Sequence, residues 1–122
     1  MLTSSPITIT DTWENIKPKK PLKAITGDAA LYLDITSIVD QFDYDELKKQ
    51  FPKNTIIAKL ITKNGEEFIL KNKDGFSTSK DQICIIISGQ DATPTNVKFG
   101  KIQIMSKVTL NNVMLIWRNS SI

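Results

Sequence analysis

The chain has 122 residues, of which 40% are hydrophobic and 24% are charged, and its net charge is +3. These values are typical of one domain, residues 1–122, that buries its own core, and they exclude both a disordered chain and a second domain. The positive charge comes from fifteen lysines and one arginine, Arg118, and because lysine lacks the planar fork with which arginine reads phosphates and guanine edges, we do not expect a nucleic-acid partner.

The first predicted element is a strand over residues 7–13, with Ile7, Ile9 and Trp13 on one face and threonines on the other. Residues 17–23 contain two prolines, which lack donors for a strand ladder, so we expect an extended edge or a loop. This segment holds a concentrated basic patch of four side chains: Lys17, Lys19, Lys20 and Lys23. A polyanion would fit the patch, but lysine and proline also protect a sheet edge from pairing, and we favour that role.

A turn at Gly27-Asp28 precedes the second predicted strand, residues 29–35. Apolar residues alternate with other residues along this segment, which is the pattern of a strand with one buried face. The alternation places Tyr32 and Asp34 on the outward face of that strand.

Residues 40–51 are the only candidate for a helix, and its core is residues 43–51. Asp43 and Glu46 have the spacing of a capping box, and Pro52 ends the helix. The acids around this start could also bind a hard cation through oxygens, but capping of the free amides explains them more simply.

Asn64-Gly65 lies between two apolar runs, residues 56–62 and 66–70. An Asn-Gly pair between such runs is the strongest short-range signal for a β-hairpin. The sequence therefore predicts a hairpin over residues 56–70.

The next predictions depend on turn residues and on apolar content. Asp74-Gly75 predicts another turn, and the polar residues 77–80 predict a mobile loop. Residues 83–88 are apolar on both faces, which is typical of a central strand covered on two sides. Residues 89–96 are expected to form a loop.

From residue 97 to Trp117, apolar residues alternate around one break at Asn111-Asn112, which predicts a core hairpin at the end of the chain. The parity of the alternation changes at Gly100, so we predict a β-bulge there. The final strand, residues 113–118, is apolar on both sides and needs a second cover. Two packed sheets would supply that cover.

The chemistry of the side chains excludes most classes of enzyme. The chain has no histidine, and its one cysteine, Cys84, stands in an apolar run where it is expected to be a small buried side chain. Histidine-based nucleophile systems, zinc sites and iron–sulfur sites are therefore excluded, and no glycine-rich phosphate loop is present. We predict no catalytic residue, no metal and no cofactor. For an enzyme, a pair of carboxylates or a lysine would remain, and changing Asp34 or Asp43 to Asn would test the carboxylates.

No apolar run approaches the ~20 residues that span a bilayer, so we predict no membrane span in this chain. The first residues lack the basic and hydrophobic regions of a signal peptide. Such a sequence is expected both for a cytoplasmic protein and for an envelope domain whose signal or anchor has been removed. The localisation therefore stays open.

The run of residues 101–117 resembles the closing strands of jelly-roll, galactose-binding-like domains, in which a core strand, a short polar break and a final strand follow in this order. The resemblance covers under a fifth of the chain and carries over no ligand-binding residue. With the strand signals above, it implies an all-β or strongly β-dominated fold. The expected fold is a two-sheet antiparallel, jelly-roll-like β-sandwich of about seven or eight strands, with one short helix at residues 43–51.

The functional hypothesis is a non-catalytic interaction or structural module that binds a protein partner or assembles through its β-sheet surface. The alternative is a carbohydrate-binding module that uses Trp13 and Tyr32 as stacking platforms, although Trp13 could instead pack at the edge of the core, and Trp117 is expected to pack in the core. A third hypothesis assigns a polyanion to the lysine patch. Because some strands are apolar on both faces, a second subunit could cover one of those faces, so an oligomer also stays open.

Overall fold

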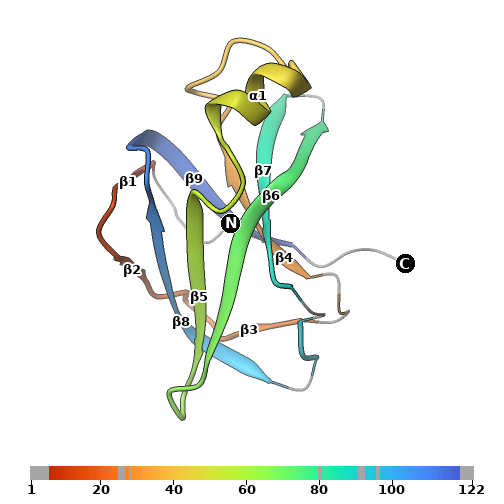
Figure 1. The fold of residues 1–122 in the computed structure, drawn as a ribbon. Coiled ribbons are helices and arrows are strands. Elements are labelled where there is room, and N and C mark those ends of the chain that lie inside the picture. The colour runs from red at the N-terminus through yellow and green to blue at the C-terminus, as the bar shows by residue number, and fades with distance from the viewer. Residues whose placement is uncertain are drawn as a thin grey trace.

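The computed structural model describes residues 6–24, 27, 29–79, 81–90, 93–95 and 97–118, except the side chain of Asp74. These residues form nine strands and one helix, α1 (Figure 1). All strand pairs are antiparallel. The bounds are β1 Ile7–Ile9, β2 Glu14–Ile16, β3 Leu22–Lys23, β4 Ala30–Asp34, α1 Tyr44–Gln50, β5 Ile56–Thr62, β6 Glu67–Ser79, β7 Gln82–Ser88, β8 Lys98–Ser106 and β9 Leu110–Arg118.

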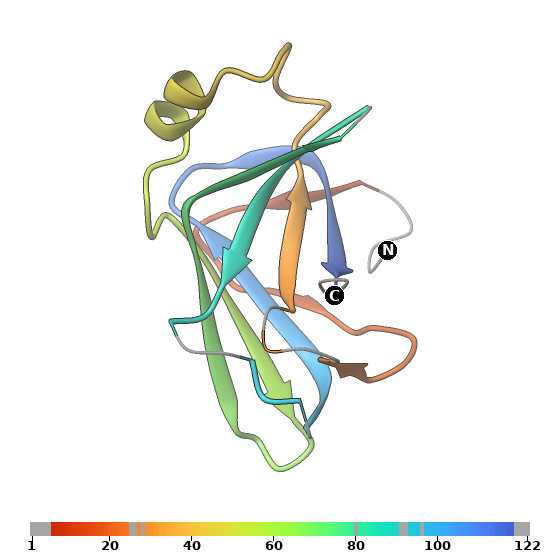
Figure 2. The ribbon, with the colours of Figure 1, turned by 90° about the vertical axis from the view of Figure 1, so that its right-hand side faces the viewer.

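The strands form one sheet that is nearly closed into a barrel (Figure 2). Their order is β1-β9-β4-β7-β6-β5-β8-β2, and β3 also pairs with β8. The two end strands, β1 and β2, are consecutive in the chain, and the backbone N–H of Ser106 donates to the carbonyl of Thr10 between them at 2.7 Å. The strongly β-dominated fold with one helix is confirmed. Two packed sheets are not confirmed, because the strands curve into a single continuous sheet.

Alternate side chains of the strands point into the barrel and fill it, as is usual for small barrels. On β4, Leu31 and Leu33 are fully buried, and their partners Ile87 and Ile85 on β7 are buried with them. Trp117 packs against this core, as expected for that ring. The core therefore runs through the interior of the barrel, and the remaining faces of the strands point outward.

Of the predicted strand over residues 7–13, only residues 7–9 form a strand, β1, and the next strand, β2, begins at Glu14. β1 pairs with β9, while β2 pairs with β8, so the chain bends at Asp11 and Thr12 to pass from one partner to the other. After β2, residues 17–23 are an extended connection that ends in the two-residue edge strand β3, as predicted.

Helix α1 begins where its cap predicts. Oδ1 of Asp43 accepts from the backbone N–H of Glu46 at 3.3 Å. Leu47 and Phe51 are buried in the core, so the helix covers one end of the barrel (Figure 1).

The hairpin around Asn64-Gly65 is confirmed as β5 and β6. Its turn is not the two-residue type, because only Gly65 has a positive φ, of 86°. The N–H of Gly65 donates to the carbonyl of Thr62, which is a type I turn followed by a left-handed glycine.

Two predictions on the following segment are wrong. Asp74-Gly75 is not a turn and residues 77–79 are not a loop, because β6 continues through both to Ser79. The pairing of β6 with β7 shifts between Asn72 and Phe76, so the extra residues bend the strand and direct it from β5 toward β7. Residue 80 lies outside the described residues.

The central strand predicted at residues 83–88 is confirmed as β7, which lies between β4 and β6. Before β4, Asp28 of the predicted turn lies outside the described residues. So do residues 91, 92 and 96 of the predicted loop 89–96.

The end of the chain confirms the bulge and contradicts the hairpin. Ile61 pairs with Lys101 and Thr62 with Phe99, so Gly100 is the extra residue. However, β8 pairs with β5, β2 and β3, whereas β9 pairs with β1 and β4. The chain turns at residues 107–109, and Asn112, with a φ of 61°, is an irregularity inside β9. A period of two identifies strands but does not specify which strands pair.

Among the described residues, no helix has the length and apolar character needed to cross a membrane.

Candidate functional site

One wall of the barrel carries exposed apolar side chains among charged ones. It is the outer face of β2, β8, β5 and β6 together with Trp13, which directly precedes β2 and has the same parity as Asn15. Register pairs Asn15 with Gln103, Gln103 with Lys59, and Lys59 with Ile69, so these side chains form one row. The Trp13 wall consists of Trp13, Asn15, Ile57, Lys59, Ile61, Glu67, Ile69, Lys71, Lys101, Gln103 and Met105.

Trp13 is 37% exposed, and its ring is oriented by the neighbouring Lys59, which is itself paired with Glu67. The ammonium of Lys59 lies 4.5 Å from the centre of the indole ring, and the same ammonium lies 3.6 Å from Oε1 of Glu67. A cation over an aromatic face is attracted by the ring quadrupole. This contact favours one orientation of the large apolar side chain, by about 0.5–1 kcal/mol, before any partner arrives.

Apolar side chains lie beside this ring on the same face. Ile69 is 43% exposed, and Ile57, Ile61 and Met105 are half-buried. Lys71, Lys101 and Asn15 are exposed around them. The wall thus combines Trp and Met, which are enriched in protein interfaces, with charged groups, and the Lys59–Glu67 pair lies among the apolar side chains.

Tyr32 lies on a different part of the barrel. Its neighbours on β7 and β9 are Ile86 and Ile116, and the guanidinium of Arg118 lies 4.6 Å from the centre of its ring. None of these strands belongs to the Trp13 wall. The structure therefore does not bring Trp13 and Tyr32 together into one platform.

The four lysines of the predicted patch, Lys17, Lys19, Lys20 and Lys23, are all exposed. Lys23 on β3 stands directly opposite Lys98 on β8. Beside this pair lies a recess of about 400 Å³ whose lining includes Pro21, Lys63, Glu66, Val97 and Lys98. No pattern in the sequence links Lys63 and Lys98 with the patch, because they come from distant parts of the chain.

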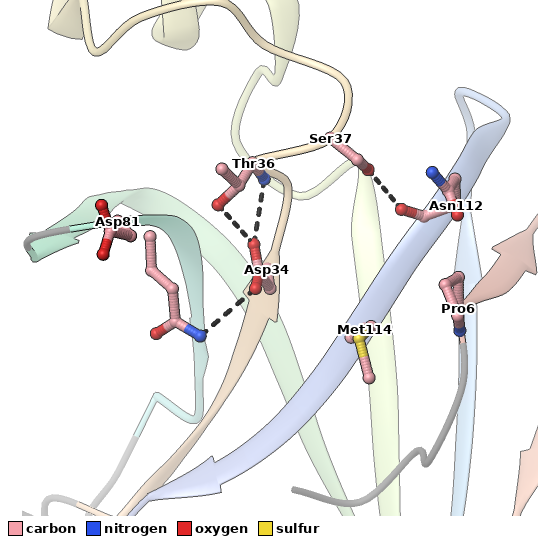
Figure 3. Close-up of a pocket in the computed structure, with 8 residues that line it drawn as sticks. Pro6, Asp34, Thr36, Ser37, Asp81, Asn112 and Met114 are labelled. Atoms are coloured by element: carbon pink, nitrogen blue, oxygen red, sulfur yellow. Dashed lines mark hydrogen bonds between the residues drawn. The ribbon is translucent and has the colours of Figure 1, made fainter.

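A second recess, of about 430 Å³, lies at the end of β4 and is drawn in Figure 3. Asp34 and Asp81 line it, which makes it the natural place to look for paired carboxylates. Oδ1 of Asp34 accepts from the backbone N–H and the hydroxyl of Thr36, at 2.9 and 2.6 Å, and Oδ2 accepts from Gln82 at 3.3 Å. Oδ1 of this carboxylate thus holds the turn after β4, and Oδ2 contacts the start of β7.

The hydroxyl of Thr36 also accepts from the backbone N–H of Ile83, which ties this turn to β7. On the other side of the recess, the hydroxyl of Ser37 donates to the carbonyl of Asn112. The recess is therefore lined by groups that join strand ends. Asp43, the other candidate carboxylate, caps α1 and does not line this recess.

Cys84 is buried, as predicted from its apolar neighbours. Burial raises the pKa of its thiol to about 11, with a further increase from Asp34 and a partly opposing effect of Arg118. A thiol with this pKa is a poor nucleophile at neutral pH because almost none of it is thiolate. Across the described residues, no three or more Cys, Asp or Glu side chains are grouped in a way that could hold a metal ion.

Comparison of the chain with family models, with curated proteins and with solved structures gives no match.

Proposed function

We propose that the protein is a non-catalytic interaction module that binds a protein partner through the Trp13 wall. The observation that carries the proposal is the orientation of Trp13, which is 37% exposed and has the Lys59 ammonium over one face of its ring. Tryptophan is enriched among the side chains that contribute most to protein interfaces. A ring that is already ordered loses less conformational entropy on binding.

The wall also has the layout that a protein partner requires. Ile69 extends the apolar centre, while Lys71 and Lys101 provide a charged rim. The Lys59–Glu67 pair lies between them and offers charges of both signs for orienting a partner. Burying Trp13 in such an interface is expected to contribute on the order of 2 kcal/mol, about a thirtyfold change in Kd.

A carbohydrate partner is less well supported. A sugar platform of two rings needs both of them on one surface, and Trp13 and Tyr32 lie on different walls. In addition, a cation lies over a face of each ring, Lys59 over Trp13 and Arg118 over Tyr32. Sugar binding would have to displace these cations or use the opposite faces.

The test places a photo-reactive amino acid at position 69, in the Trp13 wall, and in a second variant at position 108. Val108 is a matched control because it is 44% exposed but lies beyond the end of β8. Both proteins are cross-linked in the source cells, each with and without Trp13→Ala. We expect a discrete protein adduct from position 69 only, and its loss in the Trp13→Ala protein.

Equal adducts from both positions, or an adduct at position 69 that is insensitive to Trp13→Ala, would contradict the proposal. Retention on a glycan array that is lost with Trp13→Ala and Tyr32→Ala would transfer the function to carbohydrate binding. Thermal unfolding of each variant controls for loss of structure.

A further inference from the structure

The two ends of the barrel carry opposite charge. One end holds the β5–β6 hairpin, β3 and the start of β8, and the other holds α1 and the segment before it (Figures 1 and 2). Lysines gather at the hairpin end: Lys19, Lys20, Lys23, Lys63 and Lys98. Residues 40–46 at the helix end contain four acids and no base: Asp40, Asp43, Asp45 and Glu46. Within α1, Asp45 and Glu46 are paired with Lys48 and Lys49 at 3.8 and 3.7 Å, so the excess of negative charge comes from Asp40 and Asp43.

At the hairpin end, lysines lie close enough to repel one another, which is unfavourable for a domain that acts alone. Lys23 and Lys98 are directly opposite across β3 and β8, and like charges in that position destabilise a sheet. Lys63 and Lys98 both line the recess of about 400 Å³, whose apolar lining comes from Pro21 and Val97. The recess thus combines apolar surface with an excess of positive charge, since Glu66 is the one acid among the described residues that line it.

The helix end presents complementary chemistry. Phe42 is 41% exposed and Tyr44 is 43% exposed, although large apolar rings are usually buried. Tyr44 packs edge-on against Phe76 with the ring centres 5.9 Å apart, so it stands on a firm base. Phe42 follows Asp40 by two residues and directly precedes Asp43 in the chain. An aromatic side chain flanked by acids is what a lysine-lined apolar recess would accept.

We propose that copies of this chain associate head to tail, with residues 40–45 of one copy seated in the hairpin recess of the next. Phe42 enters between Pro21 and Val97, and the acids beside it face Lys63 and Lys98. The two surfaces are different patches at opposite ends, so the contact is heterologous and repeats from copy to copy as a ring or a filament. The Trp13 wall takes no part, and failure of this inference would leave the proposed function untouched.

Two variants each remove one of the two surfaces. The head variant carries Asp40→Lys and Phe42→Ala, and the tail variant carries Lys63→Glu and Lys98→Glu. All four side chains are exposed or at a recess, so the fold is expected to persist, which circular dichroism checks. Lys73→Glu with Lys107→Glu is the matched control, because it makes the same change of charge as the tail variant on exposed positions outside the hairpin recess, outside the Trp13 wall and outside residues 40–45.

Sedimentation velocity is measured over a range of concentrations at low and high ionic strength. The wild-type protein and the control are expected to form larger species at low ionic strength and to dissociate as salt screens the charges. Each variant alone is expected to have a self-association Kd at least about tenfold higher. An equimolar mixture of head and tail variants is expected to stop at a 1:1 dimer, because one intact surface of each kind is left.

A wild-type protein that is monomeric under every condition would overturn the inference. So would a control that dissociates like the tail variant, or a mixture that forms no dimer. If the monomeric wild type instead bound inorganic polyphosphate with a steep dependence on salt, the lysines would be assigned to a polyanion and the head-to-tail contact would be rejected.

Discussion

Asn72 is the buried polar side chain that joins the helix to the barrel. Its Oδ1 accepts from the backbone N–H groups of Thr55 and Ile56 at 2.9 and 2.8 Å, and its Nδ2 donates to the carbonyl of Pro52 at 2.9 Å. Asn72 is fully buried on β6, so water does not easily replace it as the hydrogen-bond partner of these backbone groups. The side chain therefore fixes the connection between Phe51 and β5.

Asn72→Ala should lower the free energy of unfolding by about 2–4 kcal/mol, because the amides of Thr55 and Ile56 lose their acceptor while staying buried. Denaturant unfolding followed by circular dichroism measures the effect. Asn111→Ala is the control, since Asn111 is exposed on β9, and it should change stability by less than about 0.5 kcal/mol. Equal effects of the two substitutions would show that Asn72 has no special role.

Cys84 makes stability depend on pH in the alkaline range. Because its pKa is raised to about 11 in the folded protein, the unfolded chain loses this proton first as the pH rises above about 9. The contribution of Cys84 to the free energy of unfolding is therefore full below pH 9 and falls between pH 9 and pH 11. Denaturation curves across this range should show a shallower decline for Cys84→Ala than for the wild type. Parallel curves would contradict the shifted thiol.

At the scale of the elements, two glycines have different backbone requirements. Gly65 has a φ of 86°, where a side chain is strained, whereas Gly100 has no positive φ and a Cβ added there would meet no heavy atom within 4 Å. Gly65→Ala should destabilise the β5–β6 hairpin by about 1 kcal/mol, and Gly100→Ala should be nearly neutral. Thermal unfolding of the two variants compares them, and a larger loss for Gly100→Ala would refute this assignment.

Local elements could be predicted from the sequence because their causes are local. The cap at Asp43, the hairpin turn at Gly65 and the bulge at Gly100 each depend on a few neighbouring residues. The continuation of β6 through Asp74-Gly75 could not be predicted, because these residues form a bend whose strand character depends on the pairing of β6 with β7 on either side of it. The separation of β8 from β9 has the same origin in long-range pairing.

In the candidate site, too, contacts that depend on long-range strand pairing could not be predicted from the sequence. The alternation over residues 7–13 predicts Trp13 on one face with Ile7 and Ile9, but Ile9 is fully buried, while Trp13, beyond the bend at residues 11 and 12, is 37% exposed. Its contact with Lys59 depends on β2, β8 and β5 lying side by side, and the separation of Tyr32 depends on β4 lying elsewhere in the order. Nothing in the spacing of these residues along the chain contains that information.

For the whole molecule, the stability of the barrel depends on residues 7–16, the segment that closes it and is called the closing segment below. Ile9 on β1 is fully buried, and its neighbour Thr10 accepts from Ser106 at the end of β8. Ile9→Ala should lower the free energy of unfolding by about 2–4 kcal/mol, through lost burial and a residual cavity. Ile69→Ala removes the same atoms from an exposed position and should cost less than about 0.5 kcal/mol.

Hydrogen exchange distinguishes local opening from global loss of stability in the Ile9→Ala protein. The Ser106 amide should lose more protection than the amides of β6 and β7, because opening of the closing segment exposes it first. Uniform loss of protection would show that the segment and the barrel open together.

The closure of the barrel by its first strands also determines when the protein can fold during synthesis. Asn15 on β2 has no strand partner until Gln103 on β8 has been synthesised, and these residues are 88 positions apart. At ribosomal rates this interval is on the order of ten seconds, while the β5–β6 hairpin can already form. The threonine-rich first strands therefore stay without partners on the nascent chain, and the barrel is completed only after the last strands have left the exit tunnel.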